Sequence, residues 1–542
     1  MSTSFKVVDL FAGPGGLAEG FSALEVDGSR AFEICLSVEK ESSAFATLRL
    51  RSFVRQFNGC IPRAYYDYIA GKADRDHLIS AFPQQWMAAC KETEQLELGA
   101  PGTDRIIDPI LDRIREDASE NAILVGGPPC QAYSLVGRSR NSGIADYKAS
   151  EDKRHFLYRE YIRIIGKLRP AAFVMENVKG FLSSKVDGDR IFSQVVSDLC
   201  AAGGAPDSYR ILPLVTGRGR DGSEYILRAE QFGIPQRRHR VILFGIRSDL
   251  APSQQIQRTV MRPQSHSPMV EDVLRGMPPL RSGLSRTADT PDAWRKAART
   301  ALLTAARAAF DEEDEELDRV ADRLRRISDE LESLQDLPPR SSGALASVAN
   351  NELAEWLVDP ALTWLPNHEA RGHMESDLAR YAFASAFAEM IGRSPKAGEF
   401  PKRLAPAHGN WESGKFVDRF RAQCWKMAST TITSHISKDG HYFIHPDPLQ
   451  CRSLTVREAA RLQTFPDNYF FEGNRTQQYV QVGNAVPPLL ARQIADVVYS
   501  AVTLALRNSS GAALNGSVPC HPTGAEEAMD PQGMLAFHAT AG

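Results

Sequence analysis

One cysteine stands in a loop whose composition suits an exposed nucleophile better than a core position. Cys130 follows Gly126-Gly127-Pro128-Pro129, which comes directly after the apolar run 122–125. The two prolines restrict the backbone and would hold the thiol in a fixed direction. A lone cysteine is usually buried and inert, and that interpretation fits the other seven cysteines. Cys130 has no bulky apolar neighbour, so it is the candidate for covalent chemistry.

An acid and two arginines near other predicted strands could assist such chemistry. Glu176 comes directly after the apolar run 171–175, where a carboxyl group is costly to bury unless it is paired or functional. Its ordinary role would be a helix cap or an ion pair. Arg238 and Arg240 stand where the strand 240–244 begins, and their alternation directs both side chains to one face. A solvated basic turn is the alternative interpretation of these arginines.

A glycine-rich turn offers a place for a nucleotide-like ligand. Gly13-Pro14-Gly15-Gly16 joins the strand 6–10 to a helical segment that starts at Leu17. Glycines let the backbone approach a ligand closely, and the start of a helix favours negative groups. Glu39 ends the next strand, where an acid can accept hydrogen bonds from a ribose. Alone this signal is weak, because many such turns hold no ligand.

Short apolar strands separated by helical lengths predict the scaffold that positions these residues. The strands are expected at 6–10, 35–38, 122–125, 171–175 and 240–244. This alternation is typical of an α/β fold with a mostly parallel sheet covered by helices on both faces. Ligands bind at the carboxyl ends of the strands in such sheets. The chemically suggestive residues lie at strand ends, so the pattern predicts one site there.

Two regions interrupt the alternation. Residues 56–105 are predicted to form an inserted helical excursion. The second region, 252–425, contains an Ala-rich helical segment from Trp294 to Phe310 and an apolar seam from Leu317 to Leu334, which Pro338-Pro339 ends. We predict an antiparallel helical pair here. Its seam either packs on its own domain or forms an oligomer contact, and the sequence leaves both open.

Basic and aromatic residues are interleaved near the end of the second region. Lys415, Phe416, Arg419, Phe420, Arg421, Trp425 and Lys426 form this stretch. Such a pattern suits contact with phosphates. A basic amphipathic surface without a ligand would produce the same pattern. The Gly-, Ala- and Ser-rich residues after Arg507 are expected to form a disordered tail.

Composition excludes several classes of protein. A net charge of -3 excludes a uniformly basic binder, although a local basic face could still bind DNA. No two cysteines form a Cys-x-x-Cys pair, which argues against a zinc ribbon, and no metal site is expected. The scattered cysteines fit a reducing cytoplasmic setting. We expect neither a secretory signal nor a membrane partner.

These segments, in this order, resemble the DNA cytosine-5 methyltransferase family of the prokaryotic restriction-modification and defence type. Besides the motifs above, Arg452–Asp467 resembles the family's late helical motif, and Gly483–Pro488 resembles its final motif. The resembling blocks cover about residues 5–250 and 428–500. The resemblance implies a Rossmann-like methyltransferase fold that uses S-adenosylmethionine, with a smaller target recognition domain that carries a helical insertion.

The resemblance also implies a role for each matched residue. Cys130 corresponds to the nucleophile that adds to C6 of cytosine, and Glu176 to the acid that supports protonation of N3. Arg238 and Arg240 correspond to the pair that contacts the flipped base. The S-adenosylmethionine pocket is expected at Phe11, Gly13, Gly15, Gly16, Leu17, Glu39, Asp108, Ile110, Asn484 and Val486. Substrate and DNA contacts are expected at Pro129, Gln131, Ser134, Asn177 and Gln236.

The domain plan follows from the same resemblance. We expect a catalytic domain at 1–250, a recognition domain at 251–427 with a helical insertion at about 292–335, a return to the catalytic domain at 428–507, and a tail at 508–542. The expected partners are double-stranded DNA and cognate restriction or defence proteins, with the chain as a monomer.

Two other functions compete with methylation of DNA. An RNA cytosine-5 methyltransferase would share Glu176-Asn177-Val178-Lys179-Gly180-Phe181, but the long second region favours DNA. A catalytically inactive DNA-binding homologue is the other, and the intact Cys130, Glu176 and Arg240 argue against it.

Overall fold

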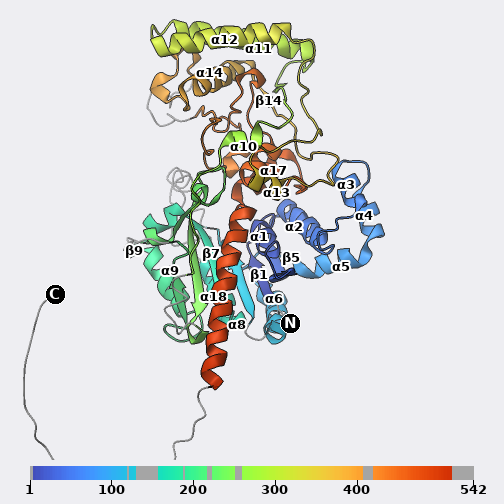
Figure 1. Cartoon of the computed structure of the whole chain (residues 1–542), viewed down its shortest axis with the longest axis vertical. Helices are drawn as coiled ribbons and strands as arrows, with labels where there is room; N and C mark the ends of the chain where they lie inside the picture. Colours follow the sequence, from blue (N-terminus) through green and yellow to red (C-terminus); the bar gives the residue numbers. More distant parts are fainter. Residues whose placement is uncertain are drawn as a thin grey trace, which may run out of the picture.

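The computed structural model describes residues 4–118, 121–129, 157–186, 189–215, 222–250, 259–406 and 419–514. The predicted nucleophile Cys130 and the predicted contacts Gln131 and Ser134 lie outside the described residues. Figure 1 shows a sheet with its helices, an upper lobe of long helices, and a connecting layer of short helices between them.

An eight-stranded sheet forms the scaffold, in the order β10-β12-β7-β6-β1-β4-β5, with β11 also paired to β12. Its strands are β1 (Phe5–Leu10), β4 (Phe32–Glu39), β5 (Thr93–Gln95), β6 (Ala122–Gly126), β7 (Ala172–Val178), β10 (Tyr209–Leu212), β11 (Ile226–Arg228) and β12 (His239–Arg247). The pairs that join β5, β4, β1, β6 and β7 are all parallel. The carboxyl ends of these five strands therefore meet at one edge, as the sequence predicts.

The strand that carries Arg240 departs from the parallel pattern. β12 runs antiparallel to β7 and to β10. β10 is therefore parallel to β7, and β12 is inserted between them. The periodicity of an apolar run does not report its direction, because a strand buried on both faces has the same composition in either orientation.

Helices cover both faces of the sheet. One face packs against α1 and α18 in a core that includes Val7, Phe21 and Ile494. The other packs against α6, α8 and α9 in a core that includes Leu124 and Ile164. The helices of the sheet domain are α1 (Gly16–Ser22), α2 (Ser42–Arg55), α6 (Thr103–Ala118), α8 (Leu157–Leu168), α9 (Ile191–Cys200) and α18 (Pro488–Leu514).

The excursion between α2 and α6 contains three short helices, and also one strand that the periodicity did not indicate. They are α3 (Arg63–Ile69), α4 (Arg75–Ala81), α5 (Pro83–Glu92) and β5. β5 pairs only with Ser37, Val38 and Glu39. Three residues are too few to produce an alternating pattern, so sequence reasoning could not find this strand.

The upper lobe buries the predicted apolar seam inside the chain. α11 (Pro291–Phe310) and α12 (Glu315–Ser333) are joined by the short turn 311–314, and α14 (Glu375–Ile391) packs with both. Val320, Leu324 and Leu331 of the seam are fully buried in this three-helix core. The seam therefore packs on its own lobe, and the interpretation as an oligomer contact is unnecessary.

A connecting layer of short helices joins the two lobes. Its members are α10 (Val270–Leu274), α13 (Asn351–Leu357), α16 (Val456–Leu462) and α17 (Arg475–Asn484). Three small pairs of strands complete the fold: β2 (Glu25–Val26) with β3 (Ser29–Arg30), β8 (Lys185–Val186) with β9 (Asp189–Arg190), and β13 (Gly283–Leu284) with β14 (Gly372–His373).

The last helix differs from expectation in two respects. It continues to Leu514 and so includes residues 508–514 of the predicted tail. The segment 475–508, which covers α17 and most of α18, is also long and apolar enough by composition to cross a membrane, with a mean hydropathy of 1.4 in an 18-residue window. Burial explains that composition, because Leu490, Ile494 and Val498 are fully enclosed between α1 and the sheet.

Candidate functional site

The glycine-rich turn and the end of β4 form one half of the site. The amide of Gly13 donates a hydrogen bond of 2.8 Å to Oε2 of Glu39, which links the ends of two neighbouring parallel strands. Phe11, Gly13 and Gly15 all have positive φ, with 100° at Gly15. Positive φ is costly for most residues, so this turn requires glycine at positions 13 and 15. Glu39 is half-buried beside this turn.

The final sequence motif reaches the same turn from the other end of the chain. An added Cβ on Gly16 would lie 2.2 Å from the carbonyl oxygen of Val486, so only glycine permits this approach. Asn484, the last residue of α17, is exposed. Leu17 is buried in the core below the turn. The structure thus brings Gly13 next to Glu39, and Gly16 next to Val486 from the far end of the sequence.

Glu176 and Arg240 form the other half of the site. Arg240 pairs with Val178 in the β7–β12 register, so its side chain is diagonal to that of Glu176 on the same face. Nε of Arg240 lies 2.7 Å from Oε1 of Glu176, and the two side chains are only 12% and 13% exposed. The N–H vector misses the oxygen, so this contact is an ion pair and not an aligned hydrogen bond.

The carboxylate of Glu176 also lies beside the segment that leads to Cys130. A Cβ on Gly127 would be 3.1 Å from Oε2 of Glu176. Gly127 and the half-buried Pro129 are described, and Cys130 follows directly. Glycine at position 127 leaves room for the carboxylate next to this segment.

Arg238 does not share the surface of Arg240. Its guanidinium is 1% exposed and donates to the carbonyl oxygens of Ile432 and Gly483. Burial, and the charge of Arg240 next, lower its pKa well below the usual value. The prediction that Arg238 contacts the base directly is therefore revised, because its donors are directed at backbone that joins the two lobes.

Two predicted DNA contacts are also buried. Gln236 is fully enclosed, and its amide donates to the carbonyl oxygen of Leu462 and accepts from the amide of Ile432. Asn177 is 4% exposed, and its Oδ1 accepts from the amide of Val178. Both predictions are wrong as surface contacts, because a polar residue type does not report whether its partner is DNA or the chain's own backbone.

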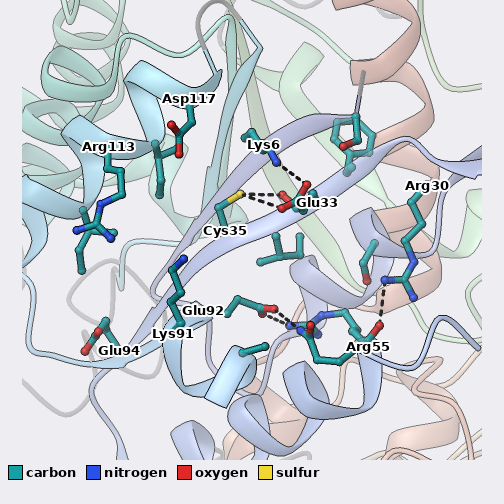
Figure 2. A pocket seen from close by; sticks show the side chains of 18 of the residues that line it. Lys6, Arg30, Glu33, Cys35, Arg55, Lys91, Glu92, Glu94, Arg113 and Asp117 are labelled. Carbon is teal, nitrogen blue, oxygen red and sulfur yellow. Dashed lines mark hydrogen bonds and ion pairs between the residues drawn. The ribbon is translucent and has the colours of Figure 1, made fainter. Parts of the chain in front are cut away.

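Asp108 and Ile110 lie on α6 and not in a loop at the carboxyl edge. Asp108 forms an ion pair of 2.8 Å with Arg163 of α8. Ile110 lines a cleft of about 780 Å³ near the amino ends of β1 and β4, together with Lys6, Glu33 and Arg113 (Figure 2). This cleft is at the opposite end of the strands from Glu39, so Ile110 is removed from the predicted cofactor pocket, whereas the carboxylate of Asp108 is paired with Arg163.

Cys35 lines the same cleft but is not suited to nucleophilic attack. Burial and then the charge of Glu33 raise the pKa of its thiol to about 12. Its Sγ contacts the backbone and side-chain oxygens of Glu33 (Figure 2). The expectation that Cys35 is not the nucleophile fits these surroundings.

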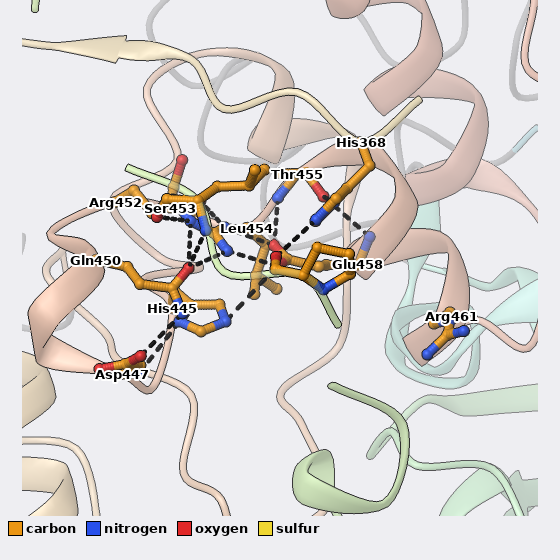
Figure 3. Close-up of polar contacts among 12 residues, drawn as sticks. His368, His445, Asp447, Gln450, Arg452, Ser453, Leu454, Thr455, Glu458 and Arg461 are labelled. Carbon is orange, nitrogen blue, oxygen red and sulfur yellow. Dashed lines mark hydrogen bonds and ion pairs between the residues drawn. The ribbon is translucent and has the colours of Figure 1, made fainter. Parts of the chain in front are cut away.

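The late helical motif is a buried structural block at the junction of the lobes. Arg452 donates two hydrogen bonds, of 2.7 and 2.6 Å, to the carboxylate of Glu458, and both side chains are buried (Figure 3). Thr455 and Glu458 form a capping box that starts α16. His368, which lies in the segment between α13 and β14, forms a hydrogen bond with Thr455. The block therefore also holds the segment that leads to α14 of the upper lobe.

The interleaved basic and aromatic stretch is only partly on the surface. Phe420 is 4% exposed and packs in the core of the upper lobe, so it cannot contact phosphates. The ring of half-buried Trp425 is covered by the guanidinium of Arg275, 4.7 Å from its centroid. Lys426 is exposed. Lys415 and Phe416 lie outside the described residues.

Comparison with known proteins supports the same interpretation. The family model of C-5 cytosine-specific DNA methylases matches residues 110–500. A Type II methyltransferase of Bacillus paralicheniformis, M.Bpa9945I, is 32% identical over 91% of this chain and 99% of its own length. M.AgeI of Thalassovita gelatinovora, also a Type II methyltransferase, is 26% identical over 92% of this chain and 100% of its own.

A solved structure has a similar fold. It is a putative DNA modification methyltransferase encoded within a prophage of Escherichia coli, with a TM-score of 0.50 and 19% identity over 92% of this chain and 100% of that one. The match to the family model over most of the chain, together with a relative above 30% identity along nearly its full length, means that this chain belongs to the family of C-5 cytosine-specific DNA methylases.

Proposed function

We propose that this chain transfers a methyl group from S-adenosylmethionine to C5 of cytosine in a specific double-stranded DNA sequence, with Cys130 as the nucleophile. One observation carries the proposal. The Glu176–Arg240 ion pair lies beside Gly127, three residues before Cys130, at the sheet edge that also holds Glu39 and the glycine-rich turn.

The residues at this edge suit S-adenosylmethionine. Gly13 and Gly15 let the backbone of the turn approach a ligand closely, and the carboxylate of Glu39 can accept hydrogen bonds from a ribose. Exposed Asn484 lies two residues before Val486, whose carbonyl oxygen faces Gly16. Bound there, the cofactor supplies an activated methyl group on sulfur. Asp108 and Ile110 are left out of this pocket because they lie on α6.

The chain's own residues activate the base. The thiolate of Cys130 adds to C6 of cytosine, and Glu176 supports protonation of N3, so that the ring accepts the sulfur. C5 becomes nucleophilic and takes the methyl group as its bond to the donor's sulfur breaks, which would leave S-adenosylhomocysteine. Loss of the C5 proton then expels the thiolate and restores the ring. Arg240 holds the carboxylate of Glu176 in place throughout.

The target cytosine must leave the duplex for this addition. C6 is stacked within the helix, and extrusion costs a few kcal/mol. The upper lobe is the part of the chain that we assign to target recognition, and exposed Lys426 near the junction is available to phosphates. We propose protection of host DNA from a cognate nuclease or within a phage-defence system as its role, with the chain acting as a monomer.

The decisive experiment uses expression in a host without cytosine-5 methylation. Bisulfite sequencing of the host DNA is expected to show one methylated sequence motif with the unchanged chain and none with Cys130→Ala. Cys60→Ala, which changes an exposed cysteine of the helical excursion, is the matched control and is expected to retain methylation. Methylation by Cys130→Ala at the level of the unchanged chain would contradict the assignment.

A trapping experiment tests the covalent step and the RNA alternative. Duplex DNA that contains the methylated motif with 5-fluorocytosine in place of cytosine is expected to form a covalent complex, because fluorine prevents loss of the C5 substituent. Transfer RNA offered in parallel is expected to accept no methyl group. Methylation of the transfer RNA without methylation of DNA would favour the RNA enzyme.

A further inference from the structure

A buried tyrosine hydroxyl contacts the glycine-rich turn from the far end of the sequence. The side chain of Tyr469 is fully buried, and its hydroxyl donates a hydrogen bond to the carbonyl oxygen of Pro14. A Cβ on Gly15 would lie 3.1 Å from the same hydroxyl oxygen. The tyrosine therefore touches the turn at two consecutive residues, between Gly13 and Gly16.

The tyrosine is itself held from three sides. The guanidinium of Arg51 covers its ring at 4.8 Å from the centroid. Arg51 donates two hydrogen bonds to Glu19 of α1, the helix that the turn begins, and one of 2.9 Å to Asn468. Arg457 of α16 donates to the carbonyl oxygen of Tyr469. All of these side chains are buried, which leaves the phenol ring little freedom.

The turn needs such support because its backbone is unusual. Phe11, Gly13 and Gly15 are all left-handed, and such a conformation persists only when surrounding structure determines it. Two hydrogen bonds tie the start of the turn to β4: the amide of Ala12 donates to the carbonyl oxygen of Val38, and the amide of Gly13 donates to Glu39. Both of these bonds lie before Pro14, so the hydrogen bond from Tyr469 adds a fixed point in the part of the turn that they leave unsupported and restricts the rotation of the peptide groups beside Pro14.

We propose that Tyr469 is a positioning residue that holds the glycine-rich turn in the conformation that binds the methyl donor. This inference rests on the proposed function, because it assigns the donor to this turn. The hydroxyl acts through the backbone of Pro14 and contacts no reacting atom, so its loss should weaken binding of the donor and leave the chemical step nearly unchanged.

Removal of the hydroxyl alone tests the proposal. In Tyr469→Phe, the dissociation constant for S-adenosylmethionine, measured by calorimetry on the full chain, is expected to rise about tenfold, the effect of one hydrogen bond to a buried carbonyl. The KM for the donor should rise by a similar factor. The kcat for unmethylated genomic DNA at saturating donor should stay within about twofold of the unchanged chain.

Tyr209→Phe is the matched control. Tyr209 is equally buried, and its hydroxyl donates to the carbonyl oxygen of another proline, Pro170, at the amino end of β7. Both variants should lose similar thermal stability, but only Tyr469→Phe should bind the donor more weakly. Hydrogen exchange of residues 11–17 in the absence of ligand should accelerate in Tyr469→Phe and not in Tyr209→Phe.

The outcomes separate the two proposals. If the unchanged chain binds the donor and Tyr469→Phe binds it equally well with unchanged exchange at residues 11–17, the positioning role is overturned and the proposed function stands. Equal weakening in Tyr209→Phe would reduce the effect to general stability and also overturn it. If the unchanged chain binds no S-adenosylmethionine, the proposed function itself fails.

Discussion

At the scale of single residues, the Glu176–Arg240 ion pair combines low exposure with incomplete hydrogen bonding. A paired carboxylate that is 13% exposed loses part of its hydration, and Nε of Arg240 is not aligned with it. Such a pair can exchange part of its contact for a ligand group without first breaking an optimal hydrogen bond. A carboxylate that is proposed to hydrogen-bond N3 of a base requires this freedom to exchange contacts.

Glu176→Gln is expected to lower kcat by roughly a hundredfold to ten-thousandfold, the usual contribution of an acid–base group. The amide keeps the shape of the side chain but cannot support a proton on N3. Methyl transfer at saturating donor and DNA measures the effect. Glu230→Gln is the matched control, because Glu230 pairs at 2.8 Å with His239, the neighbour of Arg240 on β12. Equal losses in both variants would argue against a specific role for Glu176.

Sequence reasoning found the site residues whose type does not fit an ordinary core or surface position beside their sequence neighbours. Glu176 was recognisable because a carboxyl group ended an apolar strand, and the structure pairs it with Arg240. Gln236 and Arg238 were misassigned because their burial depends on Leu462, Ile432 and Gly483, which lie about 200 residues or more away in the sequence. Local sequence does not encode such tertiary contacts.

At the scale of elements, the approach of the final motif to α1 decides whether the cofactor turn can form. Gly16 touches the carbonyl of Val486. A Cβ added at Gly20, one turn later, would clash with Ala491 and Pro488 of α18. Two glycines four residues apart on α1 therefore form a flat stripe that α18 covers. Sequence reasoning identified the glycine-rich turn but could not identify the stripe, because its partner lies at the opposite end of the chain.

Gly16→Ala is expected to force α1 and α18 apart and to lower the free energy of unfolding by about 1–3 kcal/mol, the usual cost of overpacking. Donor binding should weaken as well, because the turn moves with α1. Denaturant unfolding and calorimetry measure the two effects. In Gly398→Ala, the control, the added methyl has no heavy atom within 4 Å and the backbone needs no positive φ, so neither quantity should change.

The seam of α12 supports a second prediction at this scale. Leu324 is fully buried between α12, α11 and α14, so Leu324→Ala should cost about 2–5 kcal/mol of stability. Leu303 of α11 is 47% exposed, and Leu303→Ala should cost far less. Because the seam is filled within the chain, sedimentation should show the same molecular mass for both variants and the unchanged chain. A change of mass only in Leu324→Ala would indicate that the seam joins two chains.

At the scale of the whole molecule, the two lobes are joined by buried polar contacts in addition to apolar packing. Figure 3 shows His368, Thr455 and Glu458 among these contacts. Nδ1 of His368 lies 3.0 Å from Oγ1 of Thr455, and Nε2 lies 3.0 Å from the carbonyl oxygen of Pro278. Nε2 faces a carbonyl oxygen, which can only accept, so Nε2 carries a proton, and in the neutral ring Nδ1 accepts from the hydroxyl of Thr455. Burial favours this neutral form of His368, with its proton on Nε2.

This arrangement predicts that acid loosens the junction. Burial lowers the pKa of His368 to about 4, whereas the unfolded chain binds a proton near the ordinary value of 6.5. Between these values the unfolded state binds more protons, so stability is full above about pH 6.5 and falls as the pH decreases towards 4. The expected loss from this histidine is about 3 kcal/mol at pH 4. His445, whose pKa burial also lowers to about 4, contributes with the same sign.

Urea unfolding at pH 7.5, 6.0 and 5.0 tests the prediction. The unchanged chain should lose stability over this range, and His368→Gln should start from a lower value at pH 7.5 but lose less as the pH falls, because one of the buried histidines whose pKa is lowered is gone. His77→Gln changes an exposed histidine of α4 and should follow the unchanged chain. Parallel curves for His368→Gln and the unchanged chain would mean that His368 is already able to take up a proton in the folded state, and the neutral network at the junction would have to be abandoned.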